Sequence, residues 1–312
     1  MLWDRGHKST DVIDRRGEGG PAGAGVGGAG ILFWLFSRFG FKGILIGGAL
    51  LAVFYFMQPS SSVDSSGDGP APSAEDRSAQ RGVAPGQQPS AAKDDAAAFV
   101  GFVLDDVQTT WQALFAKQGL QYSRAKLVLF SGATASGCGT GTSQTGPFYC
   151  PTDRRVYIDL DFYRELARRF GAPGDFAQAY VIAHEVGHHV QNLLGTMERA
   201  RSLARGTDRE NEASIAQELQ ADCFAGVWAQ STKQRELLQS GDVEEGLRAA
   251  AAVGDDALQK QAQGRVTPES WTHGSSQQRV SAFKTGFDGG TIGACDTGAG
   301  AAPRAVRRPS TK

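Results

Sequence analysis

The chain has 312 residues and a formal net charge of −1, and 40% of its residues are hydrophobic. This length fits one substantial domain with appendages or two small domains. The near-neutral charge excludes a global field that would attract nucleic acid, so no nucleic-acid partner is expected.

The beginning of the chain divides into a polar arm and an apolar run. Residues 1–30 are polar and then glycine-rich, without apolar periodicity, which indicates a flexible arm. Residues 31–58 are mainly apolar, and 39–58 supply the roughly 20 residues that a helix needs to cross a bilayer, with Lys42 at the interface. The sequence therefore predicts one transmembrane helix, in contact with lipid through residues 39–58. A buried helix of a soluble core and a cleaved signal peptide are the alternatives.

Residues 59–95 are rich in Pro, Ser, Gly, Asp and Gln, which is typical of a disordered linker. Basic residues set the expected orientation, because they concentrate just before the apolar run and are distant from it in the linker. Those before the run are Arg5, Lys8, Arg15, Arg16, Arg38 and Lys42. The prediction is a single-pass protein with a cytoplasmic N-terminus and an extracytoplasmic domain.

Residues 96–297 have the periodicity of a folded domain, and 298–312 are expected to form a flexible tail. Apolar residues at helical spacing indicate a helix at the start of the domain. Strands are expected at 125–131, in "PFYC" and in "RRVYIDL". The Gly/Ser/Thr-rich stretch between the first two strands is expected to be a loop. Helices are expected over 161–171, 175–194, 208–231, 242–263 and 275–286. This order predicts an α+β fold, mostly helical with a small sheet.

Three of the five histidines lie in "YVIAHEVGHHVQNLLG", residues 180–195. His184 and His188 are four residues apart, so on a helix both imidazoles can reach one metal ion. Glu185 lies beside the pair and can reach a metal-bound water, whose pKa Zn²⁺ lowers toward ~7. This H-E-x-x-H pattern predicts a Zn²⁺ site with Glu185 as general base. A partly buried pair of structural histidines is the alternative.

The next two residues of interest flank His188. Gly187 is costly in the middle of a helix and predicts close approach by another segment. His189 is expected to point away from the metal, toward Glu185, and not to bind the ion.

A catalytic zinc site needs a third protein ligand and an open position. Glu218 and Asp222 share a face of the following helix with small residues, as a tight helix crossing would require. We therefore expect Glu218 to be the third ligand and Asp222 to hydrogen-bond the far nitrogen of a ligand histidine. A charged or N–H partner elsewhere is the alternative for Asp222.

Two further residues are candidates for binding the substrate. His273 and Arg279 lie in "SWTHGSSQQRVSAF" and are expected to donate hydrogen bonds to an oxyanion or a substrate carbonyl. His273 could equally be an ordinary loop histidine. The segment "RRVYIDLDF" is expected to form an edge strand that pairs with an extended peptide, or else an ordinary strand of the sheet.

The four cysteines can form two disulfides. Cys138 and Cys150 flank a loop with little else to hold it, and Cys223 and Cys295 would tie the end of the domain to the helix of Glu218. Both pairings fit an oxidising compartment, although sequence alone leaves the connectivity open. Cys223 is rotated away from the face of Glu218, so it is a weaker candidate for a zinc ligand.

Long stretches of the sequence resemble the bacterial "putative neutral zinc metallopeptidase" family, whose members are membrane-anchored. They include "MLWDRGHKSTDVIDRRG", "AYVIAHEVGHHVQNLLG", "ELQADCFAGVWA" and "SWTHGSSQQRVSAFKTGFDGG". The resemblance implies a gluzincin-like zincin fold in the bacterial inner membrane, with ligands His184, His188 and Glu218 and one Zn²⁺ per chain. The stretch with His273 and Arg279 is similar to one in zincins related to the CAAX-prenyl peptidases, but Gly274 stands where those have proline.

These observations predict a membrane-anchored zinc endopeptidase that hydrolyses peptide or protein substrates. The alternative is a catalytically silent zinc-containing scaffold, against which Glu185 and the open metal position argue. Hydrolysis of a non-peptide amide is a third option. The sequence leaves the oligomeric state open.

Overall fold

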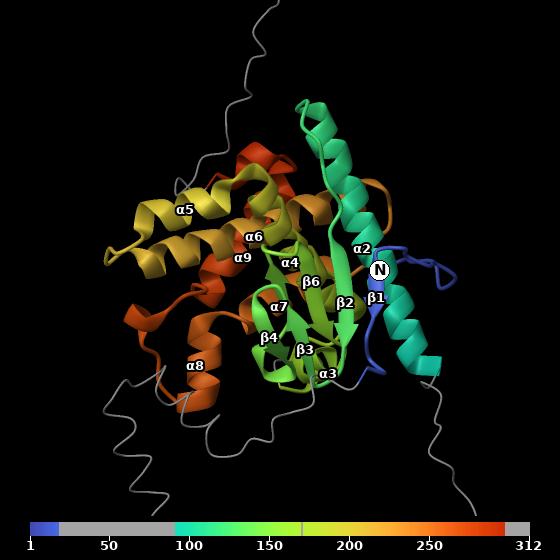
Figure 1. The fold of residues 1–312 in the computed structure, drawn as a ribbon, viewed down its shortest axis with the longest axis horizontal. Helices are drawn as coiled ribbons and strands as arrows, with labels where there is room; N and C mark the ends of the chain where they lie inside the picture. Colours follow the sequence, from blue (N-terminus) through green and yellow to red (C-terminus); the bar gives the residue numbers. More distant parts are fainter. Residues whose placement is uncertain (19–90, 170, 297–312) are drawn as a thin grey trace, which may run out of the picture. The chain divides into compact units, whose positions relative to one another are not determined.

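The computed structural model describes residues 1–18, 91–169 and 171–296. These ranges belong to one compact unit of α+β architecture, in which helices pack against a small sheet (Figure 1).

The main sheet has four strands in the order β1-β2-β6-β5. They are β1 (Val12–Asp14), β2 (Lys126–Phe130), β6 (Arg155–Asp159) and β5 (Phe148–Cys150). β1, β2 and β6 run parallel, whereas β5 pairs antiparallel with β6. A separate antiparallel hairpin consists of β3 (Ala133–Ser136) and β4 (Gly139–Thr142).

The helices account for most of the described residues. They are α2 (Ala91–Lys117), α3 (Asp161–Arg168), α4 (Asp175–Leu194), α5 (Thr196–Ala204), α6 (Glu210–Gln234), α7 (Asp242–Ala252), α8 (Asp255–Gln263) and α9 (Ser276–Gly289). Short 3₁₀ turns are η1 (Ser143–Thr145), η2 (Pro268–Ser270) and η3 (Ile292–Cys295).

Side chains alternate across the sheet and divide the core in two. Leu127 and Leu129 of β2 pack with the helices in the large cluster, whereas Val128 and Phe130 face a smaller cluster on the other side. This alternation is the period of two that any strand imposes. Within the helical layer, the rings of Trp111 on α2 and Phe224 on α6 meet edge to face at 5.0 Å. This ring contact joins α2 to α6 within the large cluster.

From β2 onward most expected helices and strands are confirmed, with three differences in their number or bounds. The expected loop after β2 contains the β3–β4 hairpin, and α5 forms where no element was expected. The expected helix 242–263 is broken into α7 and α8 at Gly254. A Cβ on Gly254 would lie only 2.3 Å from the backbone nitrogen of Ser276. A glycine at the break therefore admits the start of α9.

The prediction that residues 1–30 form a flexible arm is wrong for residues 1–18. Residues Val12–Asp14 form β1, and buried Asp11 forms ion pairs with Arg124 and Lys126 at 2.5 and 2.6 Å. The sequence did not predict this strand, because three residues are too few to show a periodicity and the surrounding composition is polar and glycine-rich. Residues 19–30 lie outside the described part of the chain.

The expected edge strand is also in a different place. β6, which carries "RVYID", is interior between β2 and β5, and β5 is the strand at that edge of the sheet. Tyr157 and Ile158 of β6 are fully buried, as an interior strand requires.

The expected transmembrane segment 31–58, residues 59–90 of the linker and the tail 298–312 lie outside the described residues. Helix α2 begins at Ala91, slightly before the expected start of the domain. Among the helices that the structure does describe, none combines the length and apolarity needed to span a bilayer.

Candidate active site

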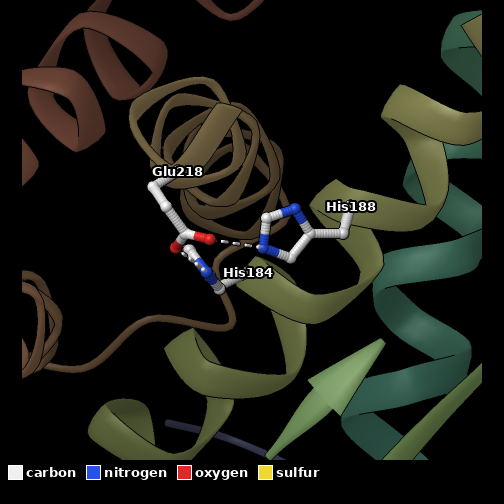
Figure 2. Close-up of side chains that lie close together, drawn as sticks. All are labelled: His184, His188 and Glu218. Carbon is white, nitrogen blue, oxygen red and sulfur yellow. Dashed lines mark ion pairs between the residues drawn. The ribbon is translucent and has the colours of Figure 1, made fainter. Parts of the chain in front are cut away.

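Helix α4 places His184 and His188 one turn apart, and it crosses α6 at Gly187. A Cβ on Gly187 would lie 2.9 Å from the carbonyl oxygen of Ala221 and 3.1 Å from its Cα. The prediction of close approach at Gly187 is thus confirmed, with α6 as the approaching segment. The crossing brings Glu218 of α6 over the two imidazoles (Figure 2).

Glu218 joins both histidines through their Nε2 atoms. Oε2 lies 3.2 Å from Nε2 of His184, and Oε1 lies 3.4 Å from Nε2 of His188. Two atoms bound tetrahedrally to one zinc at about 2.0–2.1 Å are about 3.3 Å apart. The three side chains therefore have the spacing of ligands around a single Zn²⁺, and their donor atoms all lie within 4.8 Å of one another.

The charges of this cluster also suit a cation. Burial acts to raise the pKa of Glu218, but the two histidines hold it well below its usual range. Burial disfavours the charged form of His184, yet Asp222 and Glu218 raise its pKa to about 10. The carboxylates thus stabilise positive charge at the imidazoles, which is what bound Zn²⁺ would also supply.

A buried network holds His184 from behind. Its Nδ1 lies 2.8 Å from Oδ1 of Asp222, so Nε2 is the nitrogen left for a metal. Asp222 is fully buried and also accepts a hydrogen bond from the hydroxyl of Tyr180. The structure thus places Asp222 where the sequence analysis expected it, on the far nitrogen of a candidate ligand histidine.

Arg279 belongs to this network and also borders the cavity beside the two histidines. Its Nε and Nη2 donate to the two carboxylate oxygens of Asp222 at 2.8 and 2.9 Å, and Nη1 donates to the carbonyl oxygen of Val253 at 3.1 Å. The side chain is 4% exposed. A guanidinium held this way compensates the buried carboxylate, and the expectation that it also donates to a substrate carbonyl stays a prediction.

Gln191 has the equivalent role for His188 and was not singled out in the sequence. Its Oε1 lies 2.9 Å from Nδ1 of His188, and its Nε2 donates to the carbonyl oxygen of Gln217 and to Oε1 of Gln220. The spacing of three residues on a helix was the available signal. Both imidazoles are therefore oriented with Nε2 toward Glu218.

Glu185 lies beside the three converging side chains. It is 7% exposed and lines a cavity of about 720 Å³ together with His184, His188 and Glu218. Burial raises the pKa of Glu185, and the two histidines act in the opposite direction. No hydrogen bond or ion pair joins its carboxylate to another described residue, so it is available to a molecule in the cavity.

His189 faces away from this cluster, although not toward Glu185 as expected. Its Nε2 lies 2.6 Å from the carbonyl oxygen of Ser123, and its Nδ1 lies 3.0 Å from the hydroxyl of Tyr149. Burial lowers the pKa of His189 to about 4. It is a core histidine that connects α4 to the segment before β2.

Two further regions contribute to the wall of the cavity. The segment around edge strand β5 contributes Phe148 and Tyr149, and the loop before α9 contributes His273. His273 is half exposed, with Nδ1 3.1 Å from Oδ1 of Asp255. The structure therefore places His273 in the same cavity as Glu185, as the sequence analysis expected, although nothing there pointed to Asp255.

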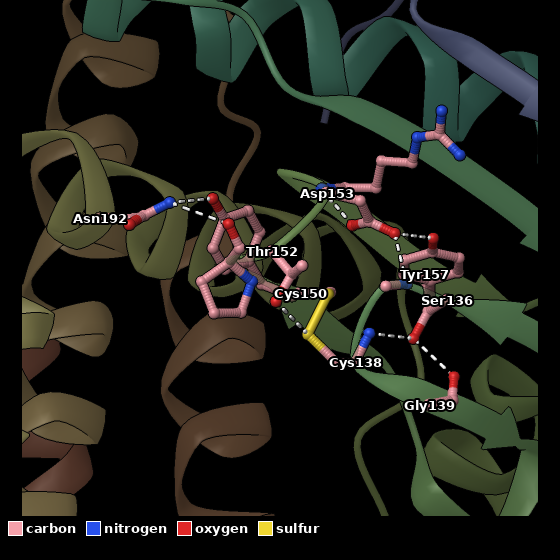
Figure 3. The surroundings of a disulfide bond; sticks show 12 residues. Ser136, Cys138, Gly139, Cys150, Thr152, Asp153, Tyr157 and Asn192 are labelled. Atoms are coloured by element: carbon pink, nitrogen blue, oxygen red, sulfur yellow. Dashed lines mark hydrogen bonds between the residues drawn. A yellow bond between two sulfur atoms is a disulfide. The ribbon is translucent and has the colours of Figure 1, made fainter.

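Both expected disulfides are present. Cys138 pairs with Cys150, which ties the β3–β4 turn to β5 (Figure 3), and Cys223 pairs with Cys295, which ties η3 to α6. No cysteine in the described residues is free. Each bridge fixes an element that borders the candidate site: β5 on one side and α6 on the other.

Comparisons with known proteins agree with this arrangement. The family model described as "Putative neutral zinc metallopeptidase" matches residues 1–298. A relative from Escherichia coli K12, with the printed name "Uncharacterized protein YpfJ", is 45% identical over 300 residues, which cover 95% of this chain and 98% of that protein. "Uncharacterized protein Rv2575" from Mycobacterium tuberculosis H37Rv is 45% identical over 204 residues, which cover 62% of this chain and 67% of that protein. No solved structure matches the chain.

Proposed function

Because the chain belongs to the family described as putative neutral zinc metallopeptidases, we propose that it is a zinc-dependent endopeptidase with a zincin-like domain. The observation that carries the proposal is the convergence of His184, His188 and Glu218 beside the carboxylate of Glu185, which has no partner among the described residues. Three protein ligands from two helices leave one position open, whereas a structural zinc usually has four. The proposed zinc content is one Zn²⁺ per chain.

The residues of the cavity have separate tasks in this proposal. Zn²⁺ in such a site supplies Lewis-acid polarisation and lowers the pKa of water. Glu185 takes a proton from the attacking water and passes it to the leaving amine as the peptide bond breaks. Asp222 and Gln191 keep the Nε2 atoms of the two histidines on the cavity side.

Edge strand β5 gives the proposed substrate a place to bind. One side of β5 pairs with β6, and Phe148 and Tyr149 also line the cavity. An extended peptide can add to such an edge through backbone hydrogen bonds, while side-chain pockets supply selectivity. This support favours peptides and proteins over small amides as substrates.

The cellular location remains a proposal. Two disulfides fit an oxidising compartment, so we place the domain outside the bacterial cytoplasm. Attachment to the inner membrane through residues 39–58 rests on the apolar sequence alone.

The test compares the full chain with its Glu185→Gln variant. Both proteins are analysed for zinc by mass spectrometry and incubated with a random peptide library, whose products are then sequenced. We expect one zinc in each protein, and cleavage that falls roughly 10²–10⁴-fold in the variant, the usual contribution of a general base. Zinc-loaded, folded wild-type protein that cleaves nothing would overturn the proposal and favour a zinc-containing scaffold.

A further inference from the structure

The carboxylate of Asp255 holds the loop that carries His273. Its Oδ2 accepts hydrogen bonds from the backbone N–H groups of Thr272, His273 and Gly274 at 2.8, 2.7 and 3.1 Å. The N–H of Asp255 in turn donates to the carbonyl oxygen of Gly274 at 2.9 Å. Asp255 is 8% exposed, so this carboxylate is withdrawn from solvent at the start of α8. Four hydrogen bonds fix the loop relative to α8.

The second oxygen of the same carboxylate faces the imidazole. Oδ1 of Asp255 lies 3.1 Å from Nδ1 of His273. A carboxylate accepts hydrogen bonds and cannot donate them, so the contact with Asp255 requires the proton on Nδ1. The hydroxyl of Thr272, 3.0 Å from the same nitrogen, can then act as a second acceptor. In neutral His273, Nε2 is then the acceptor nitrogen, and it has no hydrogen-bond partner among the described residues.

The neighbouring residue Asp256 binds the same loop but does not contact His273, so the contact with the imidazole is specific to Asp255. Asp256 also binds the loop, but at Ser276, whose N–H and hydroxyl both donate to Oδ1 at 2.7 Å. The bonds of Asp256 hold the start of α9 and involve no histidine. Two adjacent aspartates thus bind the same connection, and one of them also contacts a side chain of the cavity.

We propose that Asp255 is a positioning residue that fixes His273 as the Nδ1–H tautomer, with Nε2 presented to the cavity as a hydrogen-bond acceptor. His273 and Glu185 line the same cavity, so the group that Nε2 accepts from is an N–H of the bound peptide. This assignment replaces the expected role of His273 as a donor to a carbonyl oxygen. The substrate contact rests on the proposed peptidase function, whereas the tautomer does not.

The first measurement is nitrogen NMR of the histidine side chains in the full-length chain, which distinguishes the two neutral tautomers without any assay of activity. We expect the Nδ1–H form for His273 in wild type and in Asp256→Asn. In Asp255→Asn we expect a shift toward the Nε2–H form, which free histidine favours. The Nε2–H form in the wild-type protein would overturn the proposal, whether or not any variant folds.

The second measurement is a double-mutant cycle on peptide cleavage with Asp255→Asn and His273→Ala. Each single change should lower kcat/KM by about 2- to 10-fold, the value of one hydrogen bond, mainly through KM. If Asp255 acts through His273, the double variant should be no worse than His273→Ala. Multiplied losses, or an equal loss in Asp256→Asn, would contradict the positioning role. Absence of all cleavage would count against the proposed function and leave the tautomer result standing.

Discussion

Gln191 and Asp222 have the same role for different histidines, but Gln191 is neutral and Asp222 is a carboxylate. Each accepts a hydrogen bond from Nδ1 of one imidazole, Gln191 at 2.9 Å and Asp222 at 2.8 Å. The difference follows from their surroundings. Asp222 has the guanidinium of Arg279 to balance its charge, whereas Gln191 is bonded to the uncharged groups of Gln217 and Gln220. A carboxylate at position 191 would be buried without such a partner.

Replacing Gln191 by leucine should weaken zinc binding without removing a candidate ligand. Loss of the hydrogen bond frees the ring of His188 to rotate, and such changes typically cost about 10–100-fold in metal affinity. Competition with a chelator measures this affinity. Gln234→Leu on exposed α6 surface is the control and should leave the affinity unchanged. Equal affinities for wild type and Gln191→Leu would show that packing alone orients His188.

His189 makes stability depend on pH. Its pKa is lowered to about 4 by burial, against an ordinary value of 6.5, so folded protein rejects a proton that the unfolded chain accepts. The stabilising contribution is complete above pH 6.5 and declines as the pH falls from 6.5 toward 4. Between pH 7 and pH 5 the loss amounts to about 2 kcal/mol.

Urea unfolding of wild type and His189→Gln at pH 7 and pH 5 tests this dependence. Each group that titrates identically in the two proteins cancels in the comparison. The variant should lose about 2 kcal/mol less than wild type on acidification. An identical loss in both proteins would mean that His189 is protonated within the fold.

The residues of the site differ in how far sequence could identify them. His184, Glu185 and His188 follow from spacing on one helix, and Glu218 with Asp222 from a face shared with small residues. Asp255 and the true partner of Arg279 depend on the path of the loop before α9, which no local pattern specifies. The contact of Arg279 with Asp222 was not expected, because Asp222 lies on a different helix 57 residues away.

At the scale of elements, the site depends on how closely α4 and α6 approach. Gly187 packs against the backbone of Ala221, and α9 approaches α6 as closely, since a Cβ on Gly286 would lie 1.8 Å from the carbonyl oxygen of Cys223. Glycines on α4 and α9 therefore let both helices pack closely against α6, from two sides. Because α6 carries both Glu218 and Asp222, its position sets the distance between the carboxylates and the histidines.

Gly187→Ala should separate α4 from α6 and weaken the site. The added methyl group would lie about 3 Å from the backbone of Ala221, and overpacking of this kind costs about 1–3 kcal/mol, more than the gain in helix propensity. We expect lower stability in chemical unfolding and weaker zinc binding in the same protein. Gly293→Ala is the matched control, since no atom lies within 4 Å of its added Cβ. Unchanged zinc affinity in Gly187→Ala would show that the crossing tolerates a wider spacing.

Elements with strong periodicity were predictable, and their neighbours were not. Helix α4 was expected over its observed range, and β5 and β6 were expected as a pair. The sequence could not place β6 in the interior of the sheet. The strands beyond it, β1 and β2, are short, and they reach β6 through pairings between residues far apart in the sequence. The β3–β4 hairpin is rich in glycine and threonine and lacks apolar alternation, and the Cys138–Cys150 bridge ties its turn to β5.

At the scale of the whole molecule, the first residues of the chain are part of the domain. β1 pairs with β2 in register, with Val12 opposite Leu127 and Asp14 opposite Leu129. His7 contacts Asp105 of α2 at 2.7 Å. A chain that crosses a bilayer once leaves its two flanks on opposite sides. The expected topology, with a cytoplasmic N-terminus and an extracytoplasmic domain, and the β1–β2 pairing therefore exclude each other.

We expect the pairing to persist in the cell, so that residues 1–18 and 91–296 share one side of the membrane. The reason is energetic: separating them would expose the edge of β2 and break the ion pairs of Asp11 with Arg124 and Lys126. Single cysteines introduced at Lys8 and at Leu203, both exposed, can be probed in spheroplasts with a membrane-impermeant maleimide.

Both sites should react alike, and the two disulfides favour reaction from outside. Labelling of position 203 without position 8, with position 8 reacting after lysis, would establish a single crossing. In that case β1 could not occupy its place in the sheet, and the domain would fold around an edge formed by β2.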